Sequence, residues 1–304
     1  GTTTTALSAG GRSPGYVATT NEWNTGVAIG AWSTGGNLNT ARRAPGGAGI
    51  QTAGLAFGGE PTTAVTESYN GTSWTEVNDL NTARKFMGSA GVTNTAALAF
   101  GGESGPGTVT ETWNGTNWTE VNDLNTGRKS LAGAGTNTAA LAFGGKPGTK
   151  NETELWNGTN WTEVNNLADA RADLAGCGAT NTAALAFGGE SGPGNKNDVE
   201  SWNGTNWTTV NSLNGDGRQS LAGAGTNTAA LGFGGSTGSP SALTESWNGT
   251  NWSEVNDLNI ARYAPGGTGA NNTSALAFGG GTPGASAATE EWSIPGTITK
   301  TLTS

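Results

Sequence analysis

The chain has 304 residues but no histidine, one cysteine and one methionine. Histidine is the commonest general base and transition-metal ligand, so its absence argues against most metal-dependent and acid–base catalysis. One cysteine without histidine argues against a structural zinc site and leaves no disulfide framework. We therefore expect no catalytic residue, no metal and no cofactor. We expect Cys177 to be a small buried residue, because matching repeats have alanine there.

Charge and long apolar runs are also scarce. Charged residues make up 12% of the chain and the net charge is −9. This argues against a nucleic-acid partner, because phosphate binding needs a basic surface. No run of about 18 apolar residues exists, so we expect no insertion into a membrane. The 53 glycines argue against helices, since each one inside a helix costs about 1 kcal/mol.

What the chain has instead is an internal repeat. A Gly-Gly doublet, usually after the letters LAF, recurs at steps of 43 to 48 residues, a period typical of solenoids and propellers. A single repeat cannot bury its apolar residues alone, so neighbouring repeats must stack. We therefore expect residues 1–304 to form one closed array in a single domain. The doublets begin at Gly10, Gly58, Gly101, Gly144, Gly188, Gly234 and Gly279.

One repeat, residues 129–167, shows four short strands, which we name A to D from the innermost outward. The small residues of KSLAGAGTN suit an innermost strand A, where backbones crowd. In TAALAFGG, strand B, Leu141 and Phe143 alternate with alanines before the glycine doublet ends the strand. Strands C (TELWN) and D (NWTEVNNL) flank the hairpin signal Asn157-Gly158. One four-stranded antiparallel sheet per repeat is a propeller blade.

Aromatic and ionic residues recur with the same period. Strand C ends in an aromatic residue and strand D starts with Trp, as at Trp156 and Trp161, and we expect these residues to pack between blades. An alternative is an aromatic stacking site for sugars or bases. An arginine also opens each D-to-A connection, and a glutamate lies two residues before the strand C aromatic. We expect Arg–Glu hydrogen bonds that link blades, with a bidentate geometry as one option and a ring of anion-binding arginines as the alternative. The arginines are Arg42, Arg84, Arg128, Arg171, Arg218 and Arg262, and the glutamates are Glu67, Glu111, Glu154, Glu200, Glu245 and Glu290.

These residues resemble the kelch-repeat family, in which a hydrophobic run and a Gly-Gly doublet precede an aromatic pair. Here the run and doublet are residues 141–145 and the pair is Trp156 and Trp161. The resemblance implies a kelch-type β-propeller. The phrase NGTNWTEVNDLNTAR and the ending ATEEWSIPGTITKTLTS are also similar to repeats in tail- or fibre-associated proteins of marine bacteriophages and in related bacterial surface proteins. That similarity implies a location on a virion surface, outside the cell or on a cell surface.

The number of blades follows from counting strands. With residues 297–303 taken as the last strand D, there are seven B, seven C and seven D strands but only six A strands. We therefore expect an all-β propeller of seven four-stranded antiparallel blades, with six or eight as alternatives. Residues 1–7 align with 135–141, so blade one lacks its strand A. We favour a missing upstream segment as the reason; the alternative is a three-stranded blade closed by the C-terminal strand. The first D region, AWSTGGNLN at residues 31–39, also departs from the pattern.

The loops indicate where a ligand would bind. The B-to-C connections differ most between repeats, and loops that differ can carry specificity. They share a face of the disc with the D-to-A connections, so we expect binding there. The alternative is that these are solvated loop tips without a ligand. The most polar section of this face lies on two adjacent blades, at Lys146, Lys150, Asn151, Glu190, Lys196, Asn197 and Asp198.

Three functions are consistent with these features. The first is a non-enzymatic virion or cell-surface propeller that binds a host glycan or surface protein through its B-to-C loops and contacts other subunits of the virion or appendage. The second is a purely structural assembly module. The third is a propeller glycosidase, which needs two carboxylates about 5 to 9 Å apart. A copper oxidase like galactose oxidase is rejected, because that chemistry needs histidine ligands.

Overall fold

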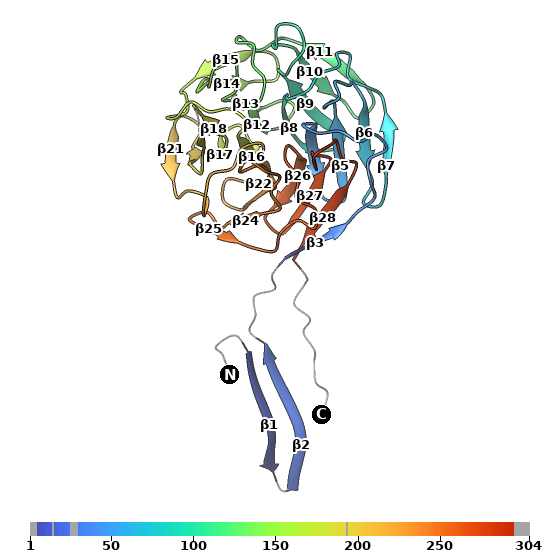
Figure 1. The fold of residues 1–304 in the computed structure, drawn as a ribbon, viewed down its shortest axis with the longest axis vertical. Coiled ribbons are helices and arrows are strands. Elements are labelled where there is room, and N and C mark those ends of the chain that lie inside the picture. Colours follow the sequence, from blue (N-terminus) through green and yellow to red (C-terminus); the bar gives the residue numbers. More distant parts are fainter. Residues whose placement is uncertain (1–4, 14, 25–29, 193, 295–304) are drawn as a thin grey trace.

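Six four-stranded antiparallel sheets surround a central axis in the computed structural model, which describes residues 5–13, 15–24, 30–192 and 194–294 (Figure 1). Each sheet is a blade with its strands in the order A to D, so the β-propeller fold is confirmed. The A strands are β4 (Gly46–Ile50), β8 (Gly88–Thr93), β12 (Ala132–Gly135), β16 (Ala175–Thr180), β22 (Ala222–Gly225) and β26 (Gly266–Asn271). The B strands are β5 (Ala53–Phe57), β9 (Ala96–Phe100), β13 (Ala140–Phe143), β17 (Ala183–Phe187), β23 (Ala230–Phe233) and β27 (Ser274–Phe278).

The outer strands complete each blade. The C strands are β6 (Thr66–Tyr69), β10 (Thr110–Trp113), β14 (Thr153–Trp156), β20 (Val199–Trp202), β24 (Thr244–Trp247) and β28 (Thr289–Ser293). The D strands are β7 (Trp74–Val77), β11 (Trp118–Val121), β15 (Trp161–Val164), β21 (Trp207–Val210), β25 (Trp252–Glu254) and β3 (Ala31–Thr34). A short hairpin of β18 (Glu190–Ser191) and β19 (Gly194–Asn195) lies in one B-to-C loop.

The described blades number six instead of the seven that we favoured, and the reason lies at the N-terminal end. The segments expected to be strands B and C of blade one form β1 (Thr5–Ser13) and β2 (Gly15–Asn24), which pair with each other outside the disc (Figure 1). Without a strand A, they have no inner strand on which a blade could be built.

The ring closes by joining distant parts of the chain. Strand β3, expected in blade one, pairs with β28 of the last blade, where Trp32 lies opposite Trp292. It thereby occupies the position that we assigned to residues 297–303, which lie outside the described residues. Pairing with β3 covers a strand edge that β28 would otherwise expose.

The core lies between blades. Leu141 and Phe143 on one face of β13 pack against Ala184 and Ala186 of the next blade, so large side chains of one sheet fit against small ones of its neighbour. The Trp207 ring of that next blade lies 4.9 Å from the Phe143 ring, edge to face. Burial of each such large side chain contributes about 1.5–3 kcal/mol. The predicted inter-blade packing of the aromatic residues is therefore confirmed.

Candidate functional site

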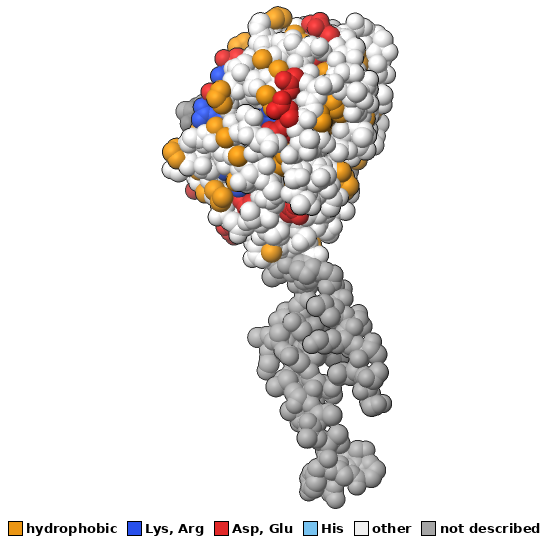
Figure 2. Space-filling view, turned by 90° about the vertical axis from the view of Figure 1, so that its right-hand side faces the viewer, with side chains coloured by type: hydrophobic (Ala, Val, Ile, Leu, Met, Phe, Trp, Pro, Cys, Tyr) orange, Lys and Arg blue, Asp and Glu red, His pale blue; other side chains and the backbone are white. Residues whose placement is uncertain are grey.

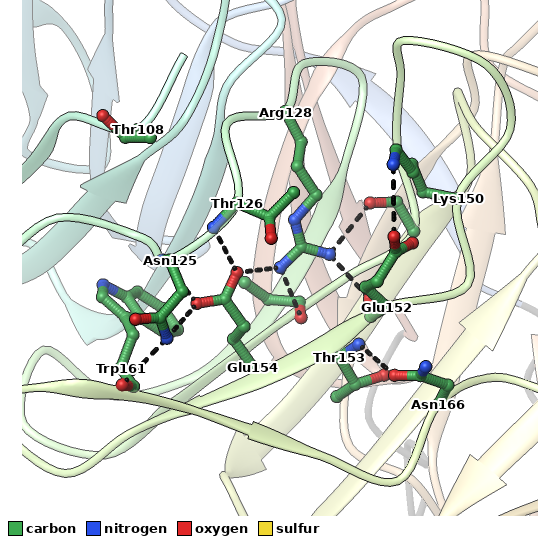
Figure 3. Close-up of polar contacts among 12 residues, drawn as sticks. Thr108, Asn125, Thr126, Arg128, Lys150, Glu152, Thr153, Glu154, Trp161 and Asn166 are labelled. Atoms are coloured by element: carbon green, nitrogen blue, oxygen red, sulfur yellow. Dashed lines mark hydrogen bonds and ion pairs between the residues drawn. The ribbon is translucent and has the colours of Figure 1, made fainter. Parts of the chain in front are cut away.

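Each blade contains a buried Arg–Glu pair that joins a D-to-A connection to strand C. In the third blade, Arg128 Nη2 donates to Glu154 Oε1 at 3.0 Å, and Arg128 Nη1 donates to the carbonyl of Glu152 at 2.6 Å (Figure 3). Glu154 Oε2 accepts from the backbone N–H and side-chain amide of Asn125, at 2.8 and 2.9 Å. Burial lowers the pKa of Arg128, while the charge of Glu154 opposes that shift.

The predicted Arg–Glu pairing is confirmed in all six blades. Within each pair one guanidinium nitrogen meets one carboxylate oxygen, instead of the bidentate option, because asparagine and backbone groups take up the second oxygen in the third blade. All six arginines are at most 1% exposed. The anion-binding alternative is therefore wrong, and so is aromatic stacking of a ligand on the strand C and D aromatics of these blades, which are all buried.

The face built by the B-to-C and D-to-A connections, called here the B–C face, carries the accessible positive charge. Within residues 30–192 and 194–294, every lysine and the one arginine that is not buried lie in these connections. Lys and Arg side chains gather accordingly along the left edge of the disc in Figure 2. These six cations are Arg43, Lys85, Lys129, Lys146, Lys150 and Lys196.

Each of these cations lies close to a carboxylate. Lys146 Nζ is 2.7 Å from both Asp173 Oδ2 and Glu190 Oε1, and it bridges two neighbouring blades. Lys129 Nζ is 2.8 Å from Glu103 Oε2. The B–C face therefore presents hydrogen-bond donors and acceptors side by side, without an excess of positive charge.

The seven residues expected to bind a ligand divide into three groups. Lys146 and Glu190 meet in the ion pairs just described. Lys150, Lys196 and Asp198 take part in ion pairs within their own B-to-C loops: Lys150 pairs with Glu152 at 3.2 Å and Lys196 with Asp198 at 3.7 Å.

The two asparagines of the expected site stabilise the fold. The side-chain amide of Asn151 donates to the Leu167 carbonyl at 3.2 Å, and that of Asn197 donates to the Gly215 carbonyl at 3.2 Å. Both amides thus hold a B-to-C loop against a D-to-A connection.

Three charged residues near Lys146 were not among the expected site residues: Glu103, Lys129 and Asp173. Lys129 and Asp173 belong to D-to-A connections, one and two residues after the repeated arginine. Those positions differ between repeats as strongly as the B-to-C loops do. This variation between repeats could have identified Lys129 and Asp173 as candidate site residues from the sequence.

A groove lies beside this charged cluster. Its volume is about 260 Å³, and it separates the loop of residues 102–107 from Lys129, Lys146 and Pro147. Both signs of charge line it. This composition suits a ligand with many hydroxyl groups better than an apolar one.

A second opening is the central channel. It has a volume of about 370 Å³, within the range of small-ligand pockets, and the A strands line it with glycine, alanine and a few larger side chains. Cys177 is one of these, and it is buried as expected. Burial disfavours the thiolate and raises the pKa of Cys177 to about 12, so the thiol is not poised to act as a nucleophile.

Two kinds of feature are absent from the residues that the structure describes. They hold no group of three or more His, Cys, Asp or Glu side chains that could bind a metal. Nor do they form a helix that is long and apolar enough to cross a membrane.

Comparisons with known proteins support the fold alone. No protein-family model and no curated protein matches the chain. Many solved structures do match it. One of them, titled "Structure of YjhT", has a TM-score of 0.68 at 15% identity, with 84% of this chain and 96% of that chain covered. Because the identity is so low, this likeness extends to the architecture and not to function.

Proposed function

We propose that this propeller is a non-enzymatic adhesion module of a virion or cell surface, and that its B–C face binds a glycan or protein on a host cell. The repeats resemble those of the kelch family, and their amino-acid sequence is similar to repeats in phage tail proteins and bacterial surface proteins. Both similarities support a location on a virion or cell surface. A rigid disc with variable loops suits several weak contacts with a repetitive surface.

One observation carries the proposal. The chain enters the disc at Ala31 and leaves it at Ser293, which are paired neighbours at one end of β28. The B-to-C loop of that blade meets the other end of β28, at Thr289. The accessible cations and variable loops thus gather on a face that points away from the chain's entry and exit, where a partner can approach.

The experiment compares two double variants with the wild type on host cells and on a glycan array. Lys146→Gln/Glu190→Gln removes the bridging lysine of the B–C face and one of its two carboxylate partners while keeping side-chain size. The control, Thr138→Ala/Thr228→Ala, changes exposed turn residues at the opposite ends of the inner strands. We expect the first variant to bind several-fold more weakly and the control to bind like the wild type.

The alternatives give different results. If the first variant attaches normally but particles or appendages carrying it dissociate more readily, the protein is a structural assembly module. If incubation with a bound glycan releases reducing ends, it is a glycosidase. Binding without such release supports adhesion.

A further inference from the structure

Six residues of the described chain combine a side chain with a left-handed backbone. Every other described residue with positive φ is a glycine. The six occupy the same place in each blade, two residues after the buried arginine. They are Ala44 (φ 50°), Phe86 (54°), Ser130 (54°), Asp173 (52°), Ser220 (52°) and Ala264 (48°).

This conformation is unfavourable for any residue with a Cβ, because the Cβ approaches the following carbonyl oxygen. Glycine would remove the strain, and the chain has 53 glycines. None of them occupies any of the six positions. A side chain is therefore kept at each position despite its cost, and such strain concentrates at functional sites.

The six residues, called here the mouth ring, encircle one end of the central channel on the B–C face. Each directly precedes the first channel-lining residue of its blade, as Ser130 precedes Leu131. Backbone N–H···O=C hydrogen bonds join ring residues of neighbouring blades. Five of the six neighbouring pairs are joined in this way, at N···O distances of 2.7–2.9 Å. The five donors and acceptors are Ser130 to Phe86, Asp173 to Ser130, Ser220 to Asp173, Ala264 to Ser220 and Ala44 to Ala264.

The backbone of the ring is thus regular while its side chains differ. The mouth ring carries one aromatic ring, two hydroxyls, one carboxylate and two methyl groups, and all six residues are partly accessible. An aromatic face with hydroxyl and carboxylate groups is suited to a sugar, which has an apolar ring face and hydroxyls at its edge. The channel beneath is large enough for one sugar unit.

The charges indicate the kind of sugar. Asp173 of the ring is paired with Lys146, and the neighbouring Lys129 is paired with Glu103. Lys85 Nζ lies over the Phe86 ring, 5.5 Å from its centre, and Lys85 shares the carboxylate of Glu60 with Arg43. Cations and carboxylates near the mouth are therefore equal in number, and a polyanionic glycan would find no excess of positive charge.

We infer that the mouth ring binds the terminal unit of a neutral oligosaccharide, with Phe86 stacking on the sugar and Ser130, Ser220 and Asp173 bonding its hydroxyls. This inference rests on the proposed glycan-binding function. It adds the ligand class and the residues that select it.

The strain allows a test that separates binding from folding. Phe86→Gly/Ser130→Gly/Ser220→Gly removes three contact groups and three strained side chains together. We expect its Tm to equal or exceed that of the wild type, while its affinity for neutral oligosaccharides on a glycan array falls at least about tenfold, as for the loss of one or two good contacts. The control, Thr138→Ala/Thr228→Ala, changes exposed residues on the opposite face of the disc, so its affinity should stay within about twofold of the wild type.

A second variant retains the backbone strain. Ser130→Ala/Ser220→Ala should weaken binding without changing Tm, and it replaces the triple variant if that variant fails to fold. Unchanged affinity in the serine variant and the triple variant, while Lys146→Gln/Glu190→Gln loses binding, would overturn the mouth ring but keep the proposed function. A preference for sulfated or uronate glycans that weakens with added salt would overturn the neutral ligand class. If the wild type binds no glycan on the array, glycan binding itself fails, and the inference fails with it.

Discussion

Tyr69 Oη donates a 2.5 Å hydrogen bond to Glu291 Oε1, and this contact joins the first blade of the disc to the last. Both residues occur only where the first and the last blade meet, and we call this contact the seam. The other blades have Trp in place of Tyr69, and serine, threonine or leucine in place of Glu291. Gly35 replaces the usual valine, and a Cβ there would lie 2.9 Å from Tyr69 Oη. The seam therefore has its own complementary set of residues, which accounts for the unusual segment at 31–39.

Tyr69→Phe should lower the free energy of unfolding by about 1–2 kcal/mol, because it removes a hydrogen bond to a carboxylate that is partly accessible. Urea unfolding at pH 7 measures the change. A double-mutant cycle with Glu291→Gln isolates the interaction between the two side chains. A coupling energy near zero would show that the contact does not help to hold the seam closed.

The same residue predicts a dependence on alkaline pH. Burial, together with the hydrogen bond to Glu291, raises the pKa of Tyr69 to about 12. A tyrosine in the unfolded chain has a pKa of about 10, so the unfolded state loses its proton first. The stability linked to Tyr69 should be fully present below pH 10 and should decline as the pH rises toward 12. Urea midpoints across this range should fall more steeply for the wild type than for Tyr69→Phe. Parallel curves would contradict the prediction.

Val199→Thr should stabilise the protein by about 1 kcal/mol. In the other blades the strand D indole N–H donates to a threonine hydroxyl of the preceding blade, as Trp207 does to Thr153 at 3.0 Å. Trp252 faces Val199 instead, and its buried N–H has no partner. The reverse change, Thr153→Val, serves as the matched control and should destabilise by a similar or larger amount. Thermal unfolding distinguishes the two, and a lower Tm for Val199→Thr would contradict the argument.

Arg128→Met should destabilise by about 3–5 kcal/mol, because it leaves the buried Glu154 without its cation. Arg84→Met should lower the free energy of unfolding by about 1–2 kcal/mol less than Arg128→Met does. Nη1 of Arg84 is buried without a partner, whereas Nη1 of Arg128 donates to the Glu152 carbonyl, and the contact of Arg84 with Glu111 is longer, at 3.2 Å. Denaturant unfolding of both variants tests the order, and equal losses would contradict it.

Deletion of residues 1–35 should destabilise the disc and promote association, because it removes β3 and exposes the edge of β28. Light scattering and thermal unfolding measure both effects, and an added peptide of residues 29–40 should reverse them. Deletion of residues 1–24 is the matched control, since it retains β3. If the longer deletion melts like its control, β3 is dispensable for closure.

Local patterns predicted most of the fold. Alternating Leu141 and Phe143, the Asn-Gly hairpins and the recurrent Trp residues specify each blade through contacts within a repeat and with the next one. The blade count depends instead on two facts that the period hides. Residues 5–24 have no strand A, and β3 pairs with the distant strand β28, where Trp32 lies opposite Trp292. A repeat count cannot distinguish a segment that completes a distant sheet from one that starts its own.

The site was predicted in part for a related reason. Loop variation pointed to Lys146 and Glu190, which do meet. The mouth ring was missed because five of its six residues are Ala, Phe or Ser, and these residue types give no indication of a left-handed backbone. Only the three-dimensional structure shows that six such ordinary residues share one conformation.

The pairing of Ala31 with Ser293 also determines how the disc would bear mechanical load. If the protein is held by its two chain ends while a partner on the B–C face is pulled, tension enters through β3 and β28 together. These strands belong to the same sheet, so the load is divided between them at a single blade. The blades that hold the partner are then loaded through the packing between blades, and not by peeling their own strands one after another.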